Sequence, residues 1–141
     1  MSKESVLFLC SENAARSQMA EALLRKNGGE RYEALSAGMQ STGVHPLAIR
    51  VMNEIGIDIS GQRSKDVREY LGRVSVRYAI FLCERAEKQC PKMFLGALNT
   101  DSWPFEDPAA ANGTEDERLA KFRAVRDQID ARIKAWLAES S

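Results

Sequence analysis

The first half of the chain alternates short apolar runs with segments whose apolar residues recur at helical spacing. Val6–Leu9 is apolar throughout and predicts a buried strand. Ser17–Lys26 has helical periodicity, and Asn27–Gly29 is a helix-stopping sequence. Tyr32–Gly38 predicts a second strand, and Pro46–Gly56 predicts a second helix that begins at proline and ends at glycine. This order of elements is typical of a parallel sheet covered by helices.

The second half continues the alternation. Ser64–Leu71 predicts a short helix, and Val76–Cys83 is a mostly apolar run suited to a central parallel strand. Met93–Leu98 predicts the last strand, and Asp116–Leu137 is a long amphipathic segment that predicts a C-terminal helix. We therefore expect one α/β domain over residues 1–141, with a four-stranded parallel sheet flanked by helices.

Composition and charge narrow the possible partners. The 141 residues are 44% hydrophobic and 28% charged, which suits one compact domain with its own core. Twenty basic residues balance twenty acidic ones, so the net charge indicates neither nucleic acid nor an anionic membrane as partner. The N-terminus has about four consecutive apolar residues, too few for a signal peptide or a membrane span. We expect a cytoplasmic protein that binds any anion locally.

The chain has three cysteines and one histidine. In a reducing compartment, three cysteines do not make a structural disulfide framework, and a single histidine argues against a histidine-containing zinc cluster. Catalytic or redox thiols are the leading interpretation, without a metal or other cofactor. Cys10 and Cys83 each close a predicted strand, and ligands collect at the carboxyl ends of strands in open sheets. We expect these two thiols to be neighbours, although a lone cysteine is as often a small buried hydrophobe.

The stretch CSENAARS, which begins at Cys10, has the composition of an oxyanion-binding loop. A loop between a strand and a helix N-terminus presents backbone N–H groups and a partial positive charge to an anion. Arg16 adds a planar fork of donors that matches a tetrahedral oxyanion, and the same field favours the thiolate form of Cys10. Ser17 can donate a hydrogen bond to the sulfur, and Asn13 tolerates the left-handed backbone that such a cradle requires.

This loop resembles the Cys-x5-Arg-Ser loop of the low-molecular-weight protein tyrosine phosphatase superfamily, and CSENAARSQMAEA is similar to its arsenate reductase branch. The resemblance covers most of the chain and continues through Ser36–Gly38, Gly43–Ser60, Phe81–Pro91 and Phe105–Ala109. It implies a flavodoxin-like three-layer fold. It also implies an oxyanion-binding loop made of Ser11, Glu12, Asn13, Ala14, Ala15, Arg16 and Ser17.

The resemblance further implies a relay of three thiols. Cys10 attacks arsenate, Cys83 attacks Cys10 and releases arsenite, and Cys90 then attacks Cys83 to form a disulfide that thioredoxin reduces. Cys83 and Cys90 are seven positions apart, about 10 Å along an intact helix at 1.5 Å per residue. A disulfide joins Cα atoms roughly 4.4 to 6.8 Å apart, so a helical segment would have to unwind on oxidation. The alternative is that Cys83 is a core residue and Cys90 is incidental.

A proton donor for the leaving oxygen is expected in the stretch DSWPFEDPAA, which contains Asp101, Glu106 and Asp107. Sequence chemistry alone does not choose among these carboxyl groups, and a solvated loop carboxylate is the plainer interpretation of Glu106. The family pattern Asp-Pro points to Asp107, which Pro108 biases toward an extended conformation. Related phosphatases follow this acid with aromatic residues, whereas three alanines follow here, which disfavours a bulky aryl substrate.

Two positions depart from the family pattern. Glu12 stands where the loop usually has glycine, and its charge would weaken anion binding unless the side chain points outward. Some family members bind a monovalent cation at positions equivalent to Asn13, Glu21, Ser36 and an aspartate, and the last position here is Lys65. A lysine ammonium paired with Glu21 would replace bound potassium and make metal dependence unnecessary. The alternative is that Lys65 faces solvent.

These observations favour a monomeric arsenate reductase that binds arsenate, or phosphate or sulfate as analogues, and uses thioredoxin as its reductant, a role that small thiols take in some related enzymes. Three alternatives stay open. A phosphatase for small phosphomonoesters would need Cys10 alone as nucleophile. A phosphocysteine carrier of the sugar phosphotransferase type would need neither Cys90 nor Asp107. An oxidant sensor would form the Cys83–Cys90 disulfide without arsenate turnover.

Overall fold

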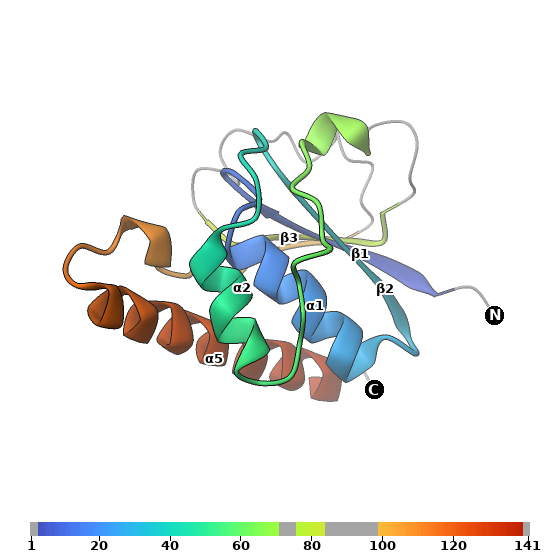
Figure 1. The fold of residues 1–141 in the computed structure, drawn as a ribbon. Coiled ribbons are helices and arrows are strands. Elements are labelled where there is room, and N and C mark those ends of the chain that lie inside the picture. The colour runs from blue at the N-terminus through green and yellow to red at the C-terminus, as the bar shows by residue number, and fades with distance from the viewer. Residues whose placement is uncertain (1–2, 71–75, 84–98, 140–141) are drawn as a thin grey trace.

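One parallel sheet of four strands, in the order β2-β1-β3-β4, organises the molecule (Figure 1). The computed structural model describes residues 3–70, 76–83 and 99–139. The strands are β1 (Glu4–Cys10), β2 (Tyr32–Gly38), β3 (Tyr78–Phe81) and β4 (Asn99–Ser102). The α/β class and the four-stranded parallel sheet are therefore as predicted.

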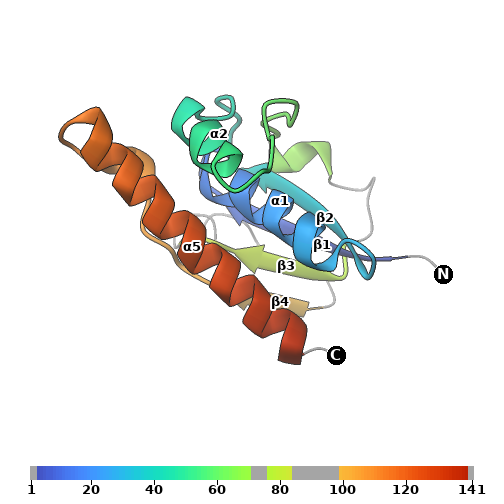
Figure 2. The ribbon, with the colours of Figure 1, turned by 60° about the horizontal axis from the view of Figure 1, so that its bottom comes forward.

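Three helices pack together on one face of this sheet (Figures 1 and 2). They are α1 (Arg16–Gly28), α2 (Pro46–Asn53) and α5 (Glu115–Glu139). Two short 3-10 turns, η1 (Val67–Glu69) and η2 (Pro108–Ala110), complete the described elements. The longest helix, α5, contacts both α1 and α2 and so closes the helical layer.

The core is built around β1, which pairs with β2 on one side and β3 on the other. Val6–Leu9 is completely buried, as is typical of a strand in the interior of a parallel sheet. The largest fully buried side chains of the core are Phe8 in this strand, Phe81 in β3 and Phe122 in α5. Burying each such side chain stabilises the fold by roughly 1.5–3 kcal/mol, so this strand is a firm base for the loop that follows it.

Most predicted elements are present, with shifted ends. The strand prediction Tyr32–Gly38 agrees with β2 at both ends. The helix predicted over Ser64–Leu71 is wrong in extent: only the turn η1 forms there. Asp66 is extended instead: it bridges Gly38 of β2 and caps η1 through its side chain.

The segment predicted as the last strand, Met93–Leu98, lies outside the described residues. The strand β4 occupies Asn99–Ser102, directly after that segment. The strand predicted over Val76–Cys83 is confined to β3, so Cys83 follows the end of its strand by two residues.

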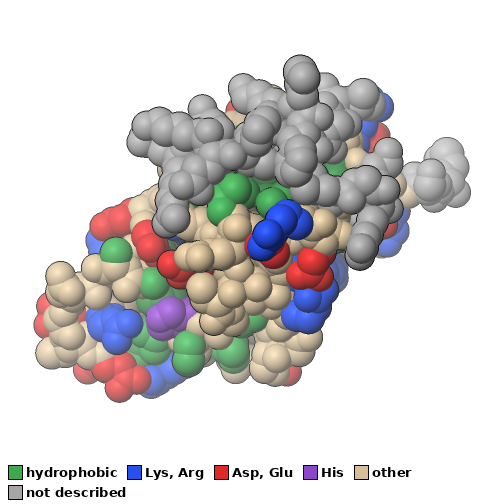
Figure 3. Space-filling model, turned by 90° about the horizontal axis from the view of Figure 1, so that it is seen from above, with side chains coloured by type: hydrophobic (Ala, Val, Ile, Leu, Met, Phe, Trp, Pro, Cys, Tyr) green, Lys and Arg blue, Asp and Glu red, His purple; other side chains and the backbone are tan. Residues whose placement is uncertain are grey.

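On the face seen from above, the described residues expose acidic, basic and hydrophobic side chains among one another (Figure 3). Over the part of the chain that the structure describes, no helix combines the length and apolar character needed to cross a membrane.

Candidate active site

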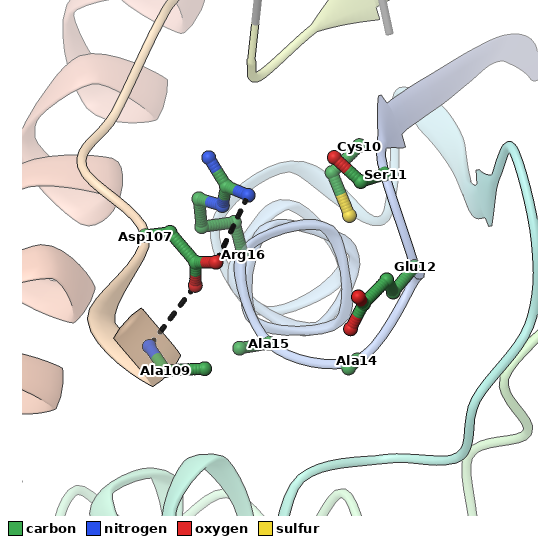
Figure 4. Close-up of a pocket in the computed structure, with 8 residues that line it drawn as sticks. All are labelled: Cys10, Ser11, Glu12, Ala14, Ala15, Arg16, Asp107 and Ala109. Carbon is green, nitrogen blue, oxygen red and sulfur yellow. Dashed lines mark hydrogen bonds and ion pairs between the residues drawn. The ribbon is translucent and has the colours of Figure 1, made fainter. Parts of the chain in front are cut away.

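A pocket opens at the carboxyl end of β1, beside the point where β1 and β3 are neighbours. Its volume is about 120 Å³. The described residues that line it are Cys10, Ser11, Glu12, Ala14, Ala15, Arg16, Asp107 and Ala109 (Figure 4). In open α/β sheets ligands bind outside the carboxyl ends of the strands, at the point where the strand order reverses, and in the order β2-β1-β3-β4 this point lies between β1 and β3. The predicted loop and one predicted acid thus meet in one pocket.

Cys10 ends β1 and is 2% exposed, so its thiol is held in a fixed environment. Ser17 Oγ lies 2.9 Å from the Cys10 sulfur, and the backbone N–H of Asn13 donates to the sulfur at 3.3 Å. Asn13 has a φ of 53°, the left-handed conformation that the sequence predicted for it. This turn directs the Asn13 N–H toward the sulfur, and both groups are suited to stabilising a thiolate.

Gly38 allows the loop to fold back against the end of β2. A Cβ atom at Gly38 would lie 2.6 Å from the backbone nitrogen of Asn13 and 2.7 Å from the carbonyl carbon of Glu12. Such distances are too short for carbon and backbone atoms, so any side chain would push the loop outward. Glycine is therefore required at position 38, the last residue of the Ser36–Gly38 stretch, because the loop backbone approaches it closely.

Arg16 begins α1 and spans the space between the loop and the segment that precedes η2. Its Nη1 donates to the Phe105 carbonyl at 3.0 Å, and its Nη2 lies 3.7 Å from Asp107 Oδ2. The Arg16 side chain is 10% exposed, so only part of the guanidinium faces the pocket. A guanidinium held by a backbone carbonyl keeps its fork in place before a ligand arrives.

Only one of the three candidate acids lines the pocket. Asp107 caps η2 by accepting from the Ala109 N–H at 3.0 Å, and its side chain is 44% exposed. Asp101 instead accepts from Trp103 Nε1 at 2.7 Å, and Glu106 pairs with Lys121 at 3.0 Å. This placement favours Asp107 as the acid that reaches a bound oxyanion.

The second thiol lies next to the loop. Cys83 is 7% exposed, and its sulfur is 3.4 Å from Ser11 Oγ, the residue after Cys10. The neighbouring strands β1 and β3 bring the two cysteines together, as their positions at strand ends predicted. Cys90 lies outside the described residues.

A buried ion pair supports the loop from behind. Lys65 is 9% exposed, which contradicts the interpretation that it faces solvent. Its Nζ lies 3.5 Å from Glu21 Oε1, which also accepts from the Ser36 hydroxyl at 2.8 Å. The Lys65 backbone N–H donates to Asn13 Oδ1 at 2.7 Å. The predicted pair of Lys65 and Glu21 is present and reaches the loop through Asn13.

Glu12 is exposed and lines the pocket rather than pointing away from it. Figure 4 shows its carboxylate turned toward the other loop residues. Its negative charge therefore lies where a bound anion would feel it.

Sequence reasoning missed two residues that contact the loop. Gln18 is completely buried and donates from Nε2 to Asn13 Oδ1 at 2.8 Å. His45 caps α2 with Nδ1 and donates its backbone N–H to the Ala14 carbonyl at 2.9 Å. Burial lowers the pKa of His45 below its ordinary value. Neither residue belongs to the contiguous Cys10–Ser17 stretch, so the motif gave no signal for it.

Several known proteins are similar to this chain in sequence and in fold. Residues 5–140 match the family described as low molecular weight phosphotyrosine protein phosphatase. An arsenate reductase of Oceanobacillus iheyensis is 42% identical over 137 residues, which cover 96% of each protein. A solved structure of an arsenate reductase in the phosphate binding state has a TM-score of 0.82 at 33% identity and covers 98% of this chain and 99% of that one. A thioredoxin-dependent arsenate reductase of Corynebacterium glutamicum has a TM-score of 0.71 at 26% identity and covers 97% of this chain and 61% of that one.

Proposed function

The chain belongs to the low molecular weight phosphotyrosine protein phosphatase family, and we propose that it is an arsenate reductase that works through a relay of three cysteines. One observation carries the proposal: a buried thiol, Cys10, shares its oxyanion-sized pocket with Arg16 and has a second buried thiol, Cys83, beside its loop. A hydrolase needs the first thiol only. A reductase needs both.

The first step is attack on arsenate. The Arg16 fork and the N–H groups at the start of α1 bind the oxyanion. The Cys10 thiolate forms a sulfur–arsenic bond, and one arsenate oxygen leaves as water. Asp107 supplies the proton for that oxygen from the opposite wall of the pocket.

The second step transfers electrons. The Cys83 thiolate attacks the Cys10 sulfur and forms a Cys10–Cys83 disulfide. The sulfur–arsenic bond breaks with its electron pair left on arsenic, so As(V) becomes As(III) and departs as arsenite. Two thiols lose the two electrons that arsenic gains. The contact between Ser11 Oγ and Cys83 Sγ supports this step because it holds the second nucleophile against the loop.

The third step regenerates Cys10. The Cys90 thiolate attacks Cys83, frees the Cys10 thiol and leaves a Cys83–Cys90 disulfide. Thioredoxin reduces that disulfide and returns the enzyme to its starting state; the thioredoxin-dependent relative supports this choice of reductant over a small thiol. No metal or organic cofactor takes part in the scheme.

A phosphatase is the second candidate because the same Cys10 attack on a phosphomonoester would give a phosphocysteine that water hydrolyses. Ala109 lines the pocket where related phosphatases place aromatic residues, so small esters fit better than aryl ones. This activity would require neither Cys83 nor Cys90.

The deciding experiment is arsenate-dependent NADPH oxidation with thioredoxin and thioredoxin reductase, with hydrolysis of a small alkyl phosphomonoester measured as phosphate release on the same preparation. Sustained oxidation that is lost in Cys90→Ser, leaving a Cys10–Cys83 disulfide by mass spectrometry, supports the relay. Cys10→Ser should abolish both activities. Ester hydrolysis without arsenate turnover would identify a phosphatase instead.

A further inference from the structure

The side chain of Gln18 is aimed at the centre of the loop. It is completely buried, and its Nε2 lies 2.8 Å from Asn13 Oδ1, 3.1 Å from the Asn13 carbonyl oxygen and 3.1 Å from the Arg63 carbonyl oxygen. All three neighbours are acceptors. A flipped amide would place Oε1 against three oxygens, so this arrangement fixes the amide with Nε2 toward the loop.

The other end of the same amide is also held. Gln62 Nε2 donates to Gln18 Oε1 at 2.7 Å and to the Gln18 carbonyl at 3.2 Å. Arg25 Nη1 in turn donates to Gln62 Oε1 at 3.2 Å. Each donor in this series points from the exposed arginine toward the buried loop.

The series continues beyond Gln18 in the same direction. Asn13 Nδ2 donates to Ser17 Oγ at 2.7 Å. The Ser17 hydroxyl accepts this hydrogen bond through its oxygen and keeps its own hydrogen, which it can donate to a Cys10 thiolate 2.9 Å away. Hydrogen bonds aligned in one direction polarise one another, so the last donor in the chain is strengthened by those before it.

We propose that Gln18 is a positioning residue for Cys10, and that Gln62 acts through it: the two side-chain amides lock Asn13 in its left-handed turn and direct the Ser17 hydroxyl toward the thiolate. The proposal rests on the proposed role of Cys10 as the nucleophile. Neither glutamine lines the pocket or contacts the Cys10 sulfur, so both act through Asn13 and Ser17.

A direct test measures the rate of Cys10 alkylation by iodoacetamide against pH, with the Cys10 peptide quantified by mass spectrometry. The whole chain is used, as wild type, Gln18→Met and Gln62→Met. Methionine keeps the length of glutamine and removes its donors. Asn27→Leu is the matched control, because the Asn27 amide donates to the Leu23 carbonyl and to Asp130 at the far end of the same helix.

The midpoint pH of alkylation should rise by roughly one unit in Gln18→Met and by about half as much in Gln62→Met, as expected for loss of hydrogen-bond support to the thiolate. The control should leave the midpoint where it is. A folded Gln18→Met protein with the wild-type midpoint would overturn the proposal. If Gln18→Met does not fold, an unchanged midpoint in Gln62→Met overturns it equally.

Alkylation requires no arsenate, so this test is separate from the proposed function. Wild-type protein that alkylates normally but does not turn over arsenate would count against the reductase assignment alone. If wild-type protein reduces arsenate but Gln18→Met has the wild-type alkylation midpoint, only the proposed role of Gln18 is contradicted.

Discussion

Two glutamates, each with two cationic partners, occupy different regions of the molecule and differ in what they control. Glu21 lies on α1 behind the loop, with a side chain that is 6% exposed. It pairs with Lys65 at 3.5 Å and with Arg25 at 3.0 Å, and it accepts from Ser36. The Lys65 backbone N–H also donates to Asn13, so this cluster is connected to the oxyanion-binding loop.

Glu54 follows α2 at the opposite end of the helical layer, and its side chain is 33% exposed. It pairs with Arg123 at 2.7 Å and with Arg126 at 3.0 Å, both on α5. Among the described residues, these contacts join two helices and reach no part of the pocket. Ion pairs of similar composition therefore differ in effect. The burial of the carboxylate sets the free-energy cost of removing it, and the position of the pair decides whether the active-site loop is disturbed.

Glu21→Gln should have the largest effect. It leaves the Lys65 ammonium buried without its carboxylate, which costs about 3 kcal/mol of unfolding free energy. Because Lys65 also holds Asn13, arsenate kcat/KM should fall with stability. Urea unfolding and the coupled reductase assay measure the two effects.

A second substitution isolates the cause. In the double variant Glu21→Gln with Lys65→Met, no buried charge is left unpaired, because the remaining partner Arg25 is 55% exposed, so much of the lost stability should return. A single variant that loses less than about 1 kcal/mol would mean that the two clusters do not differ as burial predicts.

Glu12 differs from both of these glutamates because it lines the pocket itself, and Glu12→Gln tests its effect on the anion. Among the described residues Glu12 has no ion-pair partner, and its carboxylate faces the place of a bound anion. Its neutralisation should lower the arsenate KM about fivefold, on the order of 1 kcal/mol for one like-charge contact. Glu33→Gln, on the exposed side of β2, is the control and should leave KM unchanged. Equal KM values in all three proteins would show that Glu12 does not act on the anion.

Glu54→Gln should affect stability without affecting chemistry. A hydrogen bond from Arg123 lowers the pKa of Glu54 to about 2. A carboxyl group with a lowered pKa stabilises the fold above its ordinary value near 4.5, and this contribution is lost as pH falls toward 2. Because Glu54 and Arg123 are partly exposed, and the buried Arg126 keeps Asp127 as a partner at 2.9 Å, we expect a loss of about 1 kcal/mol at pH 7 that shrinks below pH 4. Reduced arsenate turnover in this variant at pH 7 would contradict the separation of the two regions.

The loop chemistry could be predicted because its residues are contiguous and their chemistry is specific. Cys10, Arg16 and Ser17 lie in one short stretch. Parallel strands end at the same edge of a sheet, and this rule predicted that Cys83 lies near them. The three acids near residue 107 could not be separated by chemistry. Their separation depends on the partner that each one meets: Asp107 caps η2, Asp101 accepts from Trp103 and Glu106 pairs with Lys121. Only the folded chain determines these partners.

Two other features left no pattern in the sequence. The edge strand β4 has the sequence NTDS and is mostly exposed, so pairing with β3 forms it rather than an apolar alternation. Gln18 and Gln62 meet across 44 positions, and a glutamine pair has neither the periodicity of a core nor the specificity of a motif. Contacts of this kind follow from the tertiary fold.

The helix α2 connects the two regions, and His45 at its start offers the smallest test. His45 Nδ1 accepts from the Leu47 N–H at 3.1 Å, so protonation of Nδ1 would remove the cap of the helix. Burial and the charge of Arg118 lower the pKa of His45, and Asp107 opposes them.

A histidine whose pKa is lowered by folding stabilises the protein above its ordinary value of 6.5 and loses that contribution as pH falls through the folded pKa. His45→Asn keeps a capping acceptor that does not titrate. The variant should therefore lose about 0.5 kcal/mol less than wild type between pH 7 and pH 5, as measured by urea unfolding. Identical slopes in the two proteins would show that the cap survives protonation. A slope difference accompanied by an altered pH profile of Cys10 alkylation would show that α2 transmits the change to the loop through the Ala14 carbonyl.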